Sequence, residues 1–206
     1  MKIEAFKLER RFYNAPVVIE KRDGEEESRT IKGYAAIFNS WSRYLGWFKE
    51  KVDAKAFEEC DMSDVVALFN HNFDILFARS TSDTLKLGVD EKGLYYEFDA
   101  PNTSDGNNLL ELVKRGDIST SSFQFVVEED KWIEDPDEGT QRIIQKISRL
   151  IDVSPVTFAA YADSSVDVAR RSYDEYQKEN EEEQEEETKH LDVIHARANL
   201  EYIKIK

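Results

Sequence analysis

Residues 116–125 read Gly-Asp-Ile-Ser-Thr-Ser-Ser-Phe-Gln-Phe and join a predicted helix to a predicted strand. Gly116 is the residue type that commonly ends a helix, because glycine adopts the left-handed conformation without a steric penalty. From about Ser122, phenylalanines alternate with polar residues, which is typical of a strand with one buried face. Ser122 and Gln124 therefore share the face opposite the two phenylalanines.

The segment before this stretch has the periodicity of an amphipathic helix. Asp105 or Asn107 can cap its start, and its apolar stripe consists of Leu109, Leu110, Leu112 and Val113. A shorter helix is predicted from Asp53 to about Cys60, with Ala56 and Phe57 facing inward.

Short pieces in which apolar and polar residues alternate predict half-buried strands. They are 3–8, 30–38, 84–89, 94–100 and 142–147. Polar turns at 90–93 and 134–139 predict hairpins between neighbouring strands. Many short strands with few helices indicate a mainly β fold, a closed or nearly closed antiparallel β-barrel.

Composition restricts the partners of the chain. The net charge is -15 over 206 residues, which argues against nucleic acid, since phosphate binding needs clustered Lys and Arg. No run approaches the roughly 18 apolar residues of a membrane span, so a soluble protein without a membrane partner is expected. The start lacks the apolar region of a secretory signal, and the single cysteine, Cys60, cannot form an internal disulfide, so a cytoplasmic location is expected.

The composition changes at about Ser172, and an acidic run follows at 179–187. We therefore expect a β-barrel domain over 1–171 and an acidic, partly helical tail over 172–206. Near-helical spacing in the tail is shown by Leu191, Ile194, Ala198 and Tyr202. This spacing fits either a weak amphipathic helix that docks on a partner or a solvated, frayed one.

The serine cluster at 119–122 raises the question of acyl-transfer chemistry, which requires a base. His190 and His195 lie in the tail, so His71 is the histidine available to the folded part. It follows an apolar strand and is flanked by asparagines, a placement that suits a catalytic base or simply a hydrogen-bonded histidine. Likewise, Ser122 is either a nucleophile or an ordinary strand residue.

Asp152 lies between Ile151 and Val153 and is the carboxylate best placed to orient a histidine, although it could also face solvent. Cys60 is a weak candidate nucleophile because acidic neighbours disfavour its thiolate. No Cys or His pair outside the tail has metal-ligand spacing, and no glycine-rich phosphate loop is present. We therefore expect no metal and no cofactor.

These residues resemble the prohead proteases of tailed bacteriophages of the HK97 type, serine proteases with a herpesvirus-assemblin-like fold. The resemblance is carried by the order and spacing of 32–38, 48–50, 56–57, 66–72, 84–87, 90–95, 109–119, 122–125 and 152–158. Within it, His71 matches the histidine of the Asn-His motif and Ser122 the nucleophile of the Ser-Phe-x-Phe motif. Asp152 stands where Glu is more usual, and Ser121 remains a competing nucleophile.

The resemblance implies an endopeptidase that cleaves scaffold segments inside the immature capsid (the prohead) in the host cytoplasm. The major capsid protein and its N-terminal scaffold region would be substrate and partner, with self-cleavage and a possible homodimer. It also implies a Ser122, His71 and Asp152 triad, with the oxyanion stabilised by backbone N–H groups and by an arginine such as Arg149. The alternatives are a non-enzymatic capsid assembly or scaffold protein and a small β-barrel binding module.

Overall fold

The computed structural model describes residues 8–13, 16–20, 28–157, 168–182, 186, 188–190 and 194. The chain divides into two compact units, Met1–Val168 and Ala169–Lys206. The domain boundary expected from composition, between residues 171 and 172, stays a prediction.

The first unit is built mainly from β-strands. They are β1 (Leu8–Tyr13), β2 (Val18–Ile19), β3 (Thr30–Ile37), β4 (Phe48–Val52), β5 (Val66–Phe69), β6 (Asn72–Arg79), β7 (Leu85–Val89), β8 (Gly93–Asp99), β9 (Thr120–Asp135) and β10 (Gly139–Val156). A short 3-10 helix, η2 (Ser80–Ser82), follows β6, and the α-helix α1 (Ser104–Arg115) separates β8 from β9. The predicted mainly β class is therefore confirmed.

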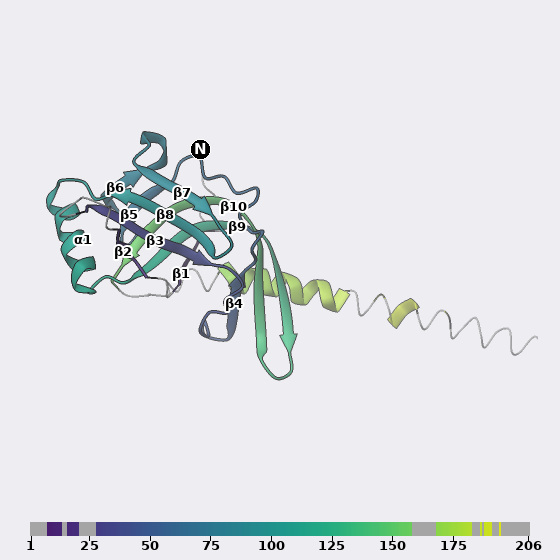
Figure 1. The fold of residues 1–206 in the computed structure, drawn as a ribbon. Coiled ribbons are helices and arrows are strands. Elements are labelled where there is room, and N and C mark those ends of the chain that lie inside the picture. The colour runs from purple at the N-terminus through teal and green to yellow at the C-terminus, as the bar shows by residue number, and fades with distance from the viewer. Residues whose placement is uncertain are drawn as a thin grey trace, which may run out of the picture. The chain divides into compact units, whose positions relative to one another are not determined.

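The strands form two sheets (Figure 1). The larger has the order β1-β9-β10-β5-β6, with β4 also paired to β10, and the smaller has the order β2-β3-β8-β7. The larger sheet curls into a half-barrel, so a closed barrel is not confirmed. Both β4 and β5 run parallel to β10, and the sheet is therefore mixed rather than wholly antiparallel as predicted.

The β9–β10 hairpin is the longest feature of the fold, with strands of 16 and 18 residues. Its turn includes Gly139, which has φ 71°, and its distal half projects past the rest of the sheet beside β4 (Figure 1). Register shifts interrupt the ladder between Ile144 and Asp152. Such bulges bend a hairpin. One half of each bent strand can therefore form the projecting arm while the other half lies in the core sheet.

The predicted strands and turns match the structure over the described residues. β3, β7 and β8 coincide with three of the predicted strands, and 142–147 lies inside β10. The hairpin turns at 90–93 and 134–139 are both present. Of the predicted strand 3–8, only Leu8 is described.

The helix α1 has the predicted apolar stripe and end but a different start. Thr103 is its N-cap, and the Thr103 side chain accepts a hydrogen bond from Gly106 N. The prediction of Asp105 or Asn107 as the cap is therefore wrong. At the other end Gly116 has φ 81° and closes the helix as predicted.

The predicted helix from Asp53 to Cys60 is wrong. This segment forms successive turns, with hydrogen bonds from Ala56 N to Asp53 O and from Cys60 N to Phe57 O. The carbonyl of Ala56 accepts a hydrogen bond from Ile147 of β10 and is therefore not available to a helical ladder. Ala56 and Phe57 are nevertheless buried, as predicted.

The core lies between the two sheets and is rich in aromatic rings. Phe123 and Phe125 of β9 stack at 4.4 Å between centroids, and Tyr96 stacks on Phe98 of β8. All four are buried, and each contributes on the order of 2–3 kcal/mol of hydrophobic stabilisation. β3 passes close to β9 at Gly33, where an added Cβ would lie 2.9 Å from Ser121 Oγ.

In the second unit the described residues 169–182, 186, 188–190 and 194 are helical. Ile194 is exposed, whereas Leu191, Ala198 and Tyr202, the other members of the predicted stripe, lie outside the described residues. None of the helices in the described residues is both long and apolar enough to cross a membrane.

Candidate active site

The structure brings together the three side chains singled out in the sequence. His71 Nδ1 lies 2.7 Å from Asp152 Oδ1, and His71 Nε2 lies 2.6 Å from Ser122 Oγ. A carboxylate only accepts hydrogen bonds, so Nδ1 carries the hydrogen and the lone pair of Nε2 faces the serine hydroxyl. This arrangement can move a proton from the serine to the imidazole.

His71 occupies a tight turn rather than the end of a strand. Phe69 pairs with Asn72 across the β5–β6 hairpin, so the loop consists of Asn70 and His71 alone. Both have left-handed backbones, with φ 53° and 58°, as a type I′ turn requires. Each such non-glycine residue costs on the order of 1–3 kcal/mol, and surrounding contacts must compensate for this cost.

Those contacts come from the end of β10 and the residue after it. Asn70 N donates to Pro155 O at 3.1 Å. The Asn70 amide accepts from Thr157 N at 2.9 Å and donates to Thr157 Oγ1 at 3.1 Å. These three hydrogen bonds attach the turn that carries His71 to the strand that carries Asp152.

Ser154 connects the same two elements from inside the protein. Its hydroxyl donates to Asp152 Oδ1 at 2.7 Å and accepts from His71 N at 3.3 Å. Ser154 is fully buried. One side chain thus holds both the carboxylate and the backbone of the histidine.

Asp152 is fully buried, and both of its oxygens accept hydrogen bonds. Oδ1 accepts from His71 and Ser154. With the amide of Gln124 oriented to match its neighbours, Gln124 Nε2 donates to Asp152 Oδ2 at 2.9 Å and Gln124 Oε1 accepts from Arg10 Nε at 3.2 Å. Burial of a carboxylate is tolerated when it is paired in this way, and the reading of Asp152 as a solvent-facing residue is excluded.

The alternation along β9 places Ser122 as predicted. Phe123 and Phe125 belong to the apolar core, while Ser122 and Gln124 both face the His71 and Asp152 side of the sheet. In the ladder Ser122 pairs with Ser154, and Gln124 pairs with Asp152. The phenylalanines on one face of β9 thus anchor this strand in the core, and Ser122 on its other face points toward His71.

Ser121, the competing serine, lies on the core side of β9. It is fully buried, and its Oγ lies 2.8 Å from Tyr96 Oη. The side chain therefore contacts a phenol and not the imidazole of His71, which argues against Ser121 as a nucleophile.

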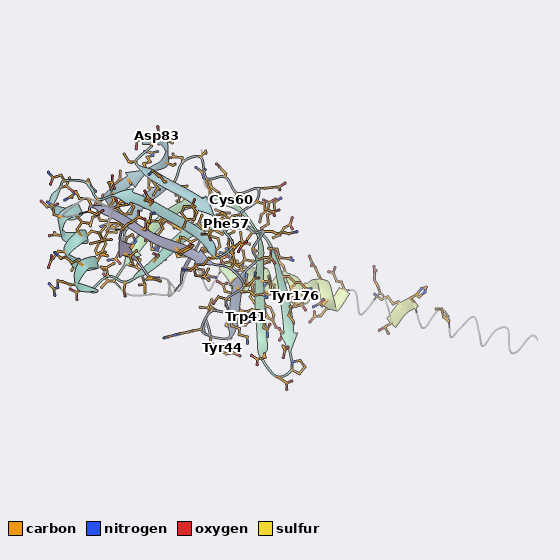
Figure 2. All side chains as sticks on the ribbon, in the orientation of Figure 1. Trp41, Tyr44, Phe57, Cys60, Asp83 and Tyr176 are labelled. Carbon is orange, nitrogen blue, oxygen red and sulfur yellow. The ribbon has the colours of Figure 1, made fainter. Side chains whose placement is uncertain are left out.

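Two other predicted residues lie away from this cluster. Arg149 pairs with Asp61 at 3.8 Å and precedes Ser154 by five positions on β10, roughly 17 Å along a strand. This separation argues against a role for Arg149 at Ser122. Cys60 lies on the turns that follow β4, next to Phe57 (Figure 2), and burial raises the pKa of its thiol to about 12.

A cluster of buried charges borders the site through β1. Arg11 pairs with Glu50 and with Glu9, and Arg142 pairs with Glu9, Glu50 and Asp130. Burial disfavours the charge on Glu9, but the guanidinium groups of Arg142 and Arg11 outweigh it and hold the pKa of Glu9 below its usual value. Within the described residues, no three His, Cys, Asp or Glu side chains are grouped as metal ligands.

Ser154, Gln124 and Arg11 were not predicted as parts of the site. The alternation of the two strands held a signal for two of them, since Ser154 follows Asp152 by two residues and Gln124 follows Ser122 by two. Residues spaced by two share one face of a strand. No local signal could have placed Arg11, because its contact with Ser122 spans 111 residues.

A family model described as Caudovirus prohead serine protease matches residues 15–179. The chain belongs to this family. The predicted resemblance to prohead proteases is thereby confirmed, and the chain is an enzyme of the serine protease class. As a family member it is a capsid-maturation protease.

Among solved structures, the bacteriophage T4 capsid assembly protease is similar to this prohead protease, with a TM-score of 0.46 and 10% sequence identity. The similarity covers 72% of this chain and 96% of that chain. No match was found among curated protein sequences.

Proposed function

We propose that this prohead protease cleaves peptide bonds with Ser122 as nucleophile, His71 as general base and Asp152 as the orienting carboxylate. One observation carries the proposal: a continuous chain of hydrogen bonds runs from Ser122 Oγ through the imidazole to Asp152, with lengths of 2.6 and 2.7 Å. Membership of a serine protease family supports it.

In this mechanism Asp152 holds the tautomer that leaves Nε2 of His71 free to take a proton. Ser122 Oγ attacks the scissile carbonyl carbon while its proton moves to Nε2. The imidazolium then returns this proton to the leaving amine as the C–N bond breaks, which leaves an acyl-enzyme. Water repeats the sequence, with His71 again acting first as base and then as acid, and releases the second product.

We further propose that the substrate is the scaffold part of the capsid, including the N-terminal scaffold region of the major capsid protein. Cleavage would take place inside the prohead in the host cytoplasm, followed by self-cleavage. Family membership supports capsid proteins as partners. The proposed homodimer is tested by sedimentation of the purified Ser122→Ala variant, which cannot digest itself.

The decisive experiment is co-expression with the capsid protein proposed as its substrate, followed by intact mass measurement of both proteins. Ser122→Ala and His71→Ala are expected to leave the capsid protein full length, because triad residues contribute on the order of 10⁴-fold or more to turnover. Ser121→Ala is the matched control, since it removes a neighbouring serine hydroxyl from the other face of β9.

Wild type and Ser121→Ala should both truncate the capsid protein. Cleavage by Ser122→Ala would place the nucleophile elsewhere, and loss of cleavage only in Ser121→Ala would transfer the role to that residue. Full-length products in every case would support the scaffold alternative, in which the fold organises coat subunits without hydrolysis.

A further inference from the structure

The hydroxyl of Ser122 has two hydrogen-bond acceptors within reach. His71 Nε2 lies 2.6 Å from Ser122 Oγ, and the backbone carbonyl oxygen of Arg11 lies 2.9 Å from it. A serine hydroxyl carries a single hydrogen. While β1 is in place, the Arg11 carbonyl therefore competes with His71 for the hydrogen that the proposed mechanism transfers.

β1 also occupies space beside the serine. It pairs antiparallel with β9, with Arg11 opposite Phe123 and Phe12 opposite Ser122. The residue Ser122 is only 6% exposed, whereas a scissile carbonyl must come within roughly 3–3.5 Å of the attacking oxygen. Without β1, β9 would be the edge of the sheet, and extended peptides commonly bind by adding a strand to such an edge.

Besides its backbone ladder with β9, β1 is attached through charged side chains. Of its described side chains, Glu9 and Arg11 are buried in the ion cluster, and none belongs to the hydrophobic core. Arg142 does not depend on Glu9 alone, because it also pairs with Glu50 and with Asp130, neither of which belongs to β1. Loss of the Glu9 and Arg11 side chains from the cluster would leave Arg142 paired with Glu50 and Asp130, so departure of β1 leaves no buried guanidinium unpaired among the described residues.

We propose that β1 is an internal occupant of the substrate-binding edge of β9. It covers Ser122 in the structure described here, and an extended substrate segment takes its place, antiparallel to β9, before cleavage. The match to the family begins at residue 15, after the end of β1. This agrees with β1 being an addition to the part of the chain that carries the proposed triad. This inference rests on the proposed role of Ser122.

A reversible lock tests the proposal in the full-length protein. Leu8 and Val126 are directly opposite each other in the β1–β9 ladder, and paired residues lie within the Cα separation that a disulfide needs. In Leu8→Cys/Val126→Cys, the disulfide holds β1 on β9, and a reductant releases it. Lys86→Cys/Glu97→Cys is the matched control, since that pair lies opposite in the β7–β8 ladder of the other sheet.

The rate at which a rhodamine-tagged fluorophosphonate labels Ser122 is the first readout, and truncation of purified capsid protein is the second. The oxidised lock should react at least tenfold more slowly than its reduced form in both assays, while the control pair should react equally in both states. Equal rates for the oxidised and reduced lock would overturn the inference.

A second variant does not depend on disulfide formation. Arg11→Ala removes the side chain that fixes β1 in the ion cluster, and it should label about three- to tenfold faster than wild type. A synthetic peptide of residues 8–13, added in excess, should slow this labelling again. Labelling that is unchanged or slower in Arg11→Ala would contradict the inference.

The two proposals fail in different ways. If β1 does not cover the site, Ser122 is labelled in every variant at one rate, and hydrolysis still requires it. If Ser122 is not the nucleophile, hydrolysis persists in Ser122→Ala, and both the proposed function and this inference are overturned.

Discussion

Ser154 is the residue on which the geometry of the proposed triad depends most after the triad itself. It donates to the oxygen of Asp152 that faces His71, and it accepts from the backbone of His71. It touches no reacting atom, so it acts as a positioning residue. Its place opposite Ser122 in the β9–β10 ladder means that one register positions Ser122, Asp152 and Ser154.

Replacing Ser154 with Ala should lower kcat about tenfold and leave KM nearly unchanged. The hydroxyl orients the carboxylate and the histidine turn but takes no part in binding the peptide, and loss of a buried hydrogen bond costs about 1–2 kcal/mol. Steady-state kinetics on a capsid-derived peptide would measure the split between kcat and KM.

Ser148→Ala is the control for this prediction, because Ser148 lies on the same strand and its hydroxyl donates to Val126 O, away from the triad. Ser154→Thr keeps the hydroxyl and should recover part of kcat. A parallel rise in KM, or a fall in kcat equal to that in Ser148→Ala, would show that Ser154 acts on stability alone.

Cys60 should be chemically inert in the folded protein. Burial raises the pKa of its thiol to about 12, so the thiolate fraction at pH 8 is on the order of 10³ lower than for a free cysteine with a pKa near 8.5. Iodoacetamide should therefore alkylate the native chain far more slowly than the chain in guanidinium chloride, as followed by intact mass. Rapid alkylation of the native chain, or loss of hydrolysis upon it, would contradict this assignment.

At the scale of elements, the strands were predictable where one face is apolar. The alternation around Phe123 and Phe125 gave the face of Ser122 correctly, because a strand with one buried face specifies its own orientation. The left-handed turn at His71 was not predictable, since only Asn70 fits the Asn-Gly preference of such turns and His71 stands where glycine is favoured. Contacts from Pro155 and Thr157, distant in sequence, stabilise it.

β1 and the predicted 53–60 helix show why local patterns were insufficient. The inward residues of β1 are charged, so hydropathy gives no buried face, and their partners Glu50 and Arg142 lie far along the chain. The 53–60 helix was predicted from a capping Asp53 and from Ala56 and Phe57 facing inward, but β10 takes the Ala56 carbonyl for a hydrogen bond. Tertiary contacts decided both elements.

The attachment of β1 should depend on pH through Glu9. Its pKa is held below the usual value, so Glu9 stabilises the folded state fully above its unfolded pKa, near 4.5, and this contribution is lost as pH falls through the lowered folded value. Glu9→Gln should reduce the free energy of unfolding by about 3 kcal/mol at pH 7, because it leaves a buried charge cluster with one anion fewer.

Urea unfolding between pH 3 and 8 would measure this effect. The difference between wild type and Glu9→Gln should narrow below pH 4.5, when Glu9 itself becomes protonated. Glu111→Gln, on the exposed face of α1, should follow wild type at every pH. A difference that stays constant down to pH 3 would mean that the charge of Glu9 does not stabilise the fold.

At the scale of the whole molecule, the proposed triad lies entirely within the first compact unit, and the acidic run 179–187 lies in the second. Among the described residues, the side chains that hold Ser122, His71 and Asp152 in place belong to residues 10–157. Hydrolysis and recruitment to the capsid can therefore be separated experimentally.

Deleting residues 172–206 should impair incorporation of the protease into proheads and leave hydrolysis of a capsid-derived peptide within about twofold of wild type. The physical reason is that the deletion removes the acidic segment whose spacing fits a helix that docks on a partner, here taken as coat or scaffold, and leaves the described contacts of the triad in place. Quantitative mass spectrometry of purified proheads would count the protease, and full-length Ser122→Ala is the control, since packaging should not require turnover. Equal packaging of the truncated and full-length proteins would exclude the tail as the recruiting segment and assign recruitment to the first unit.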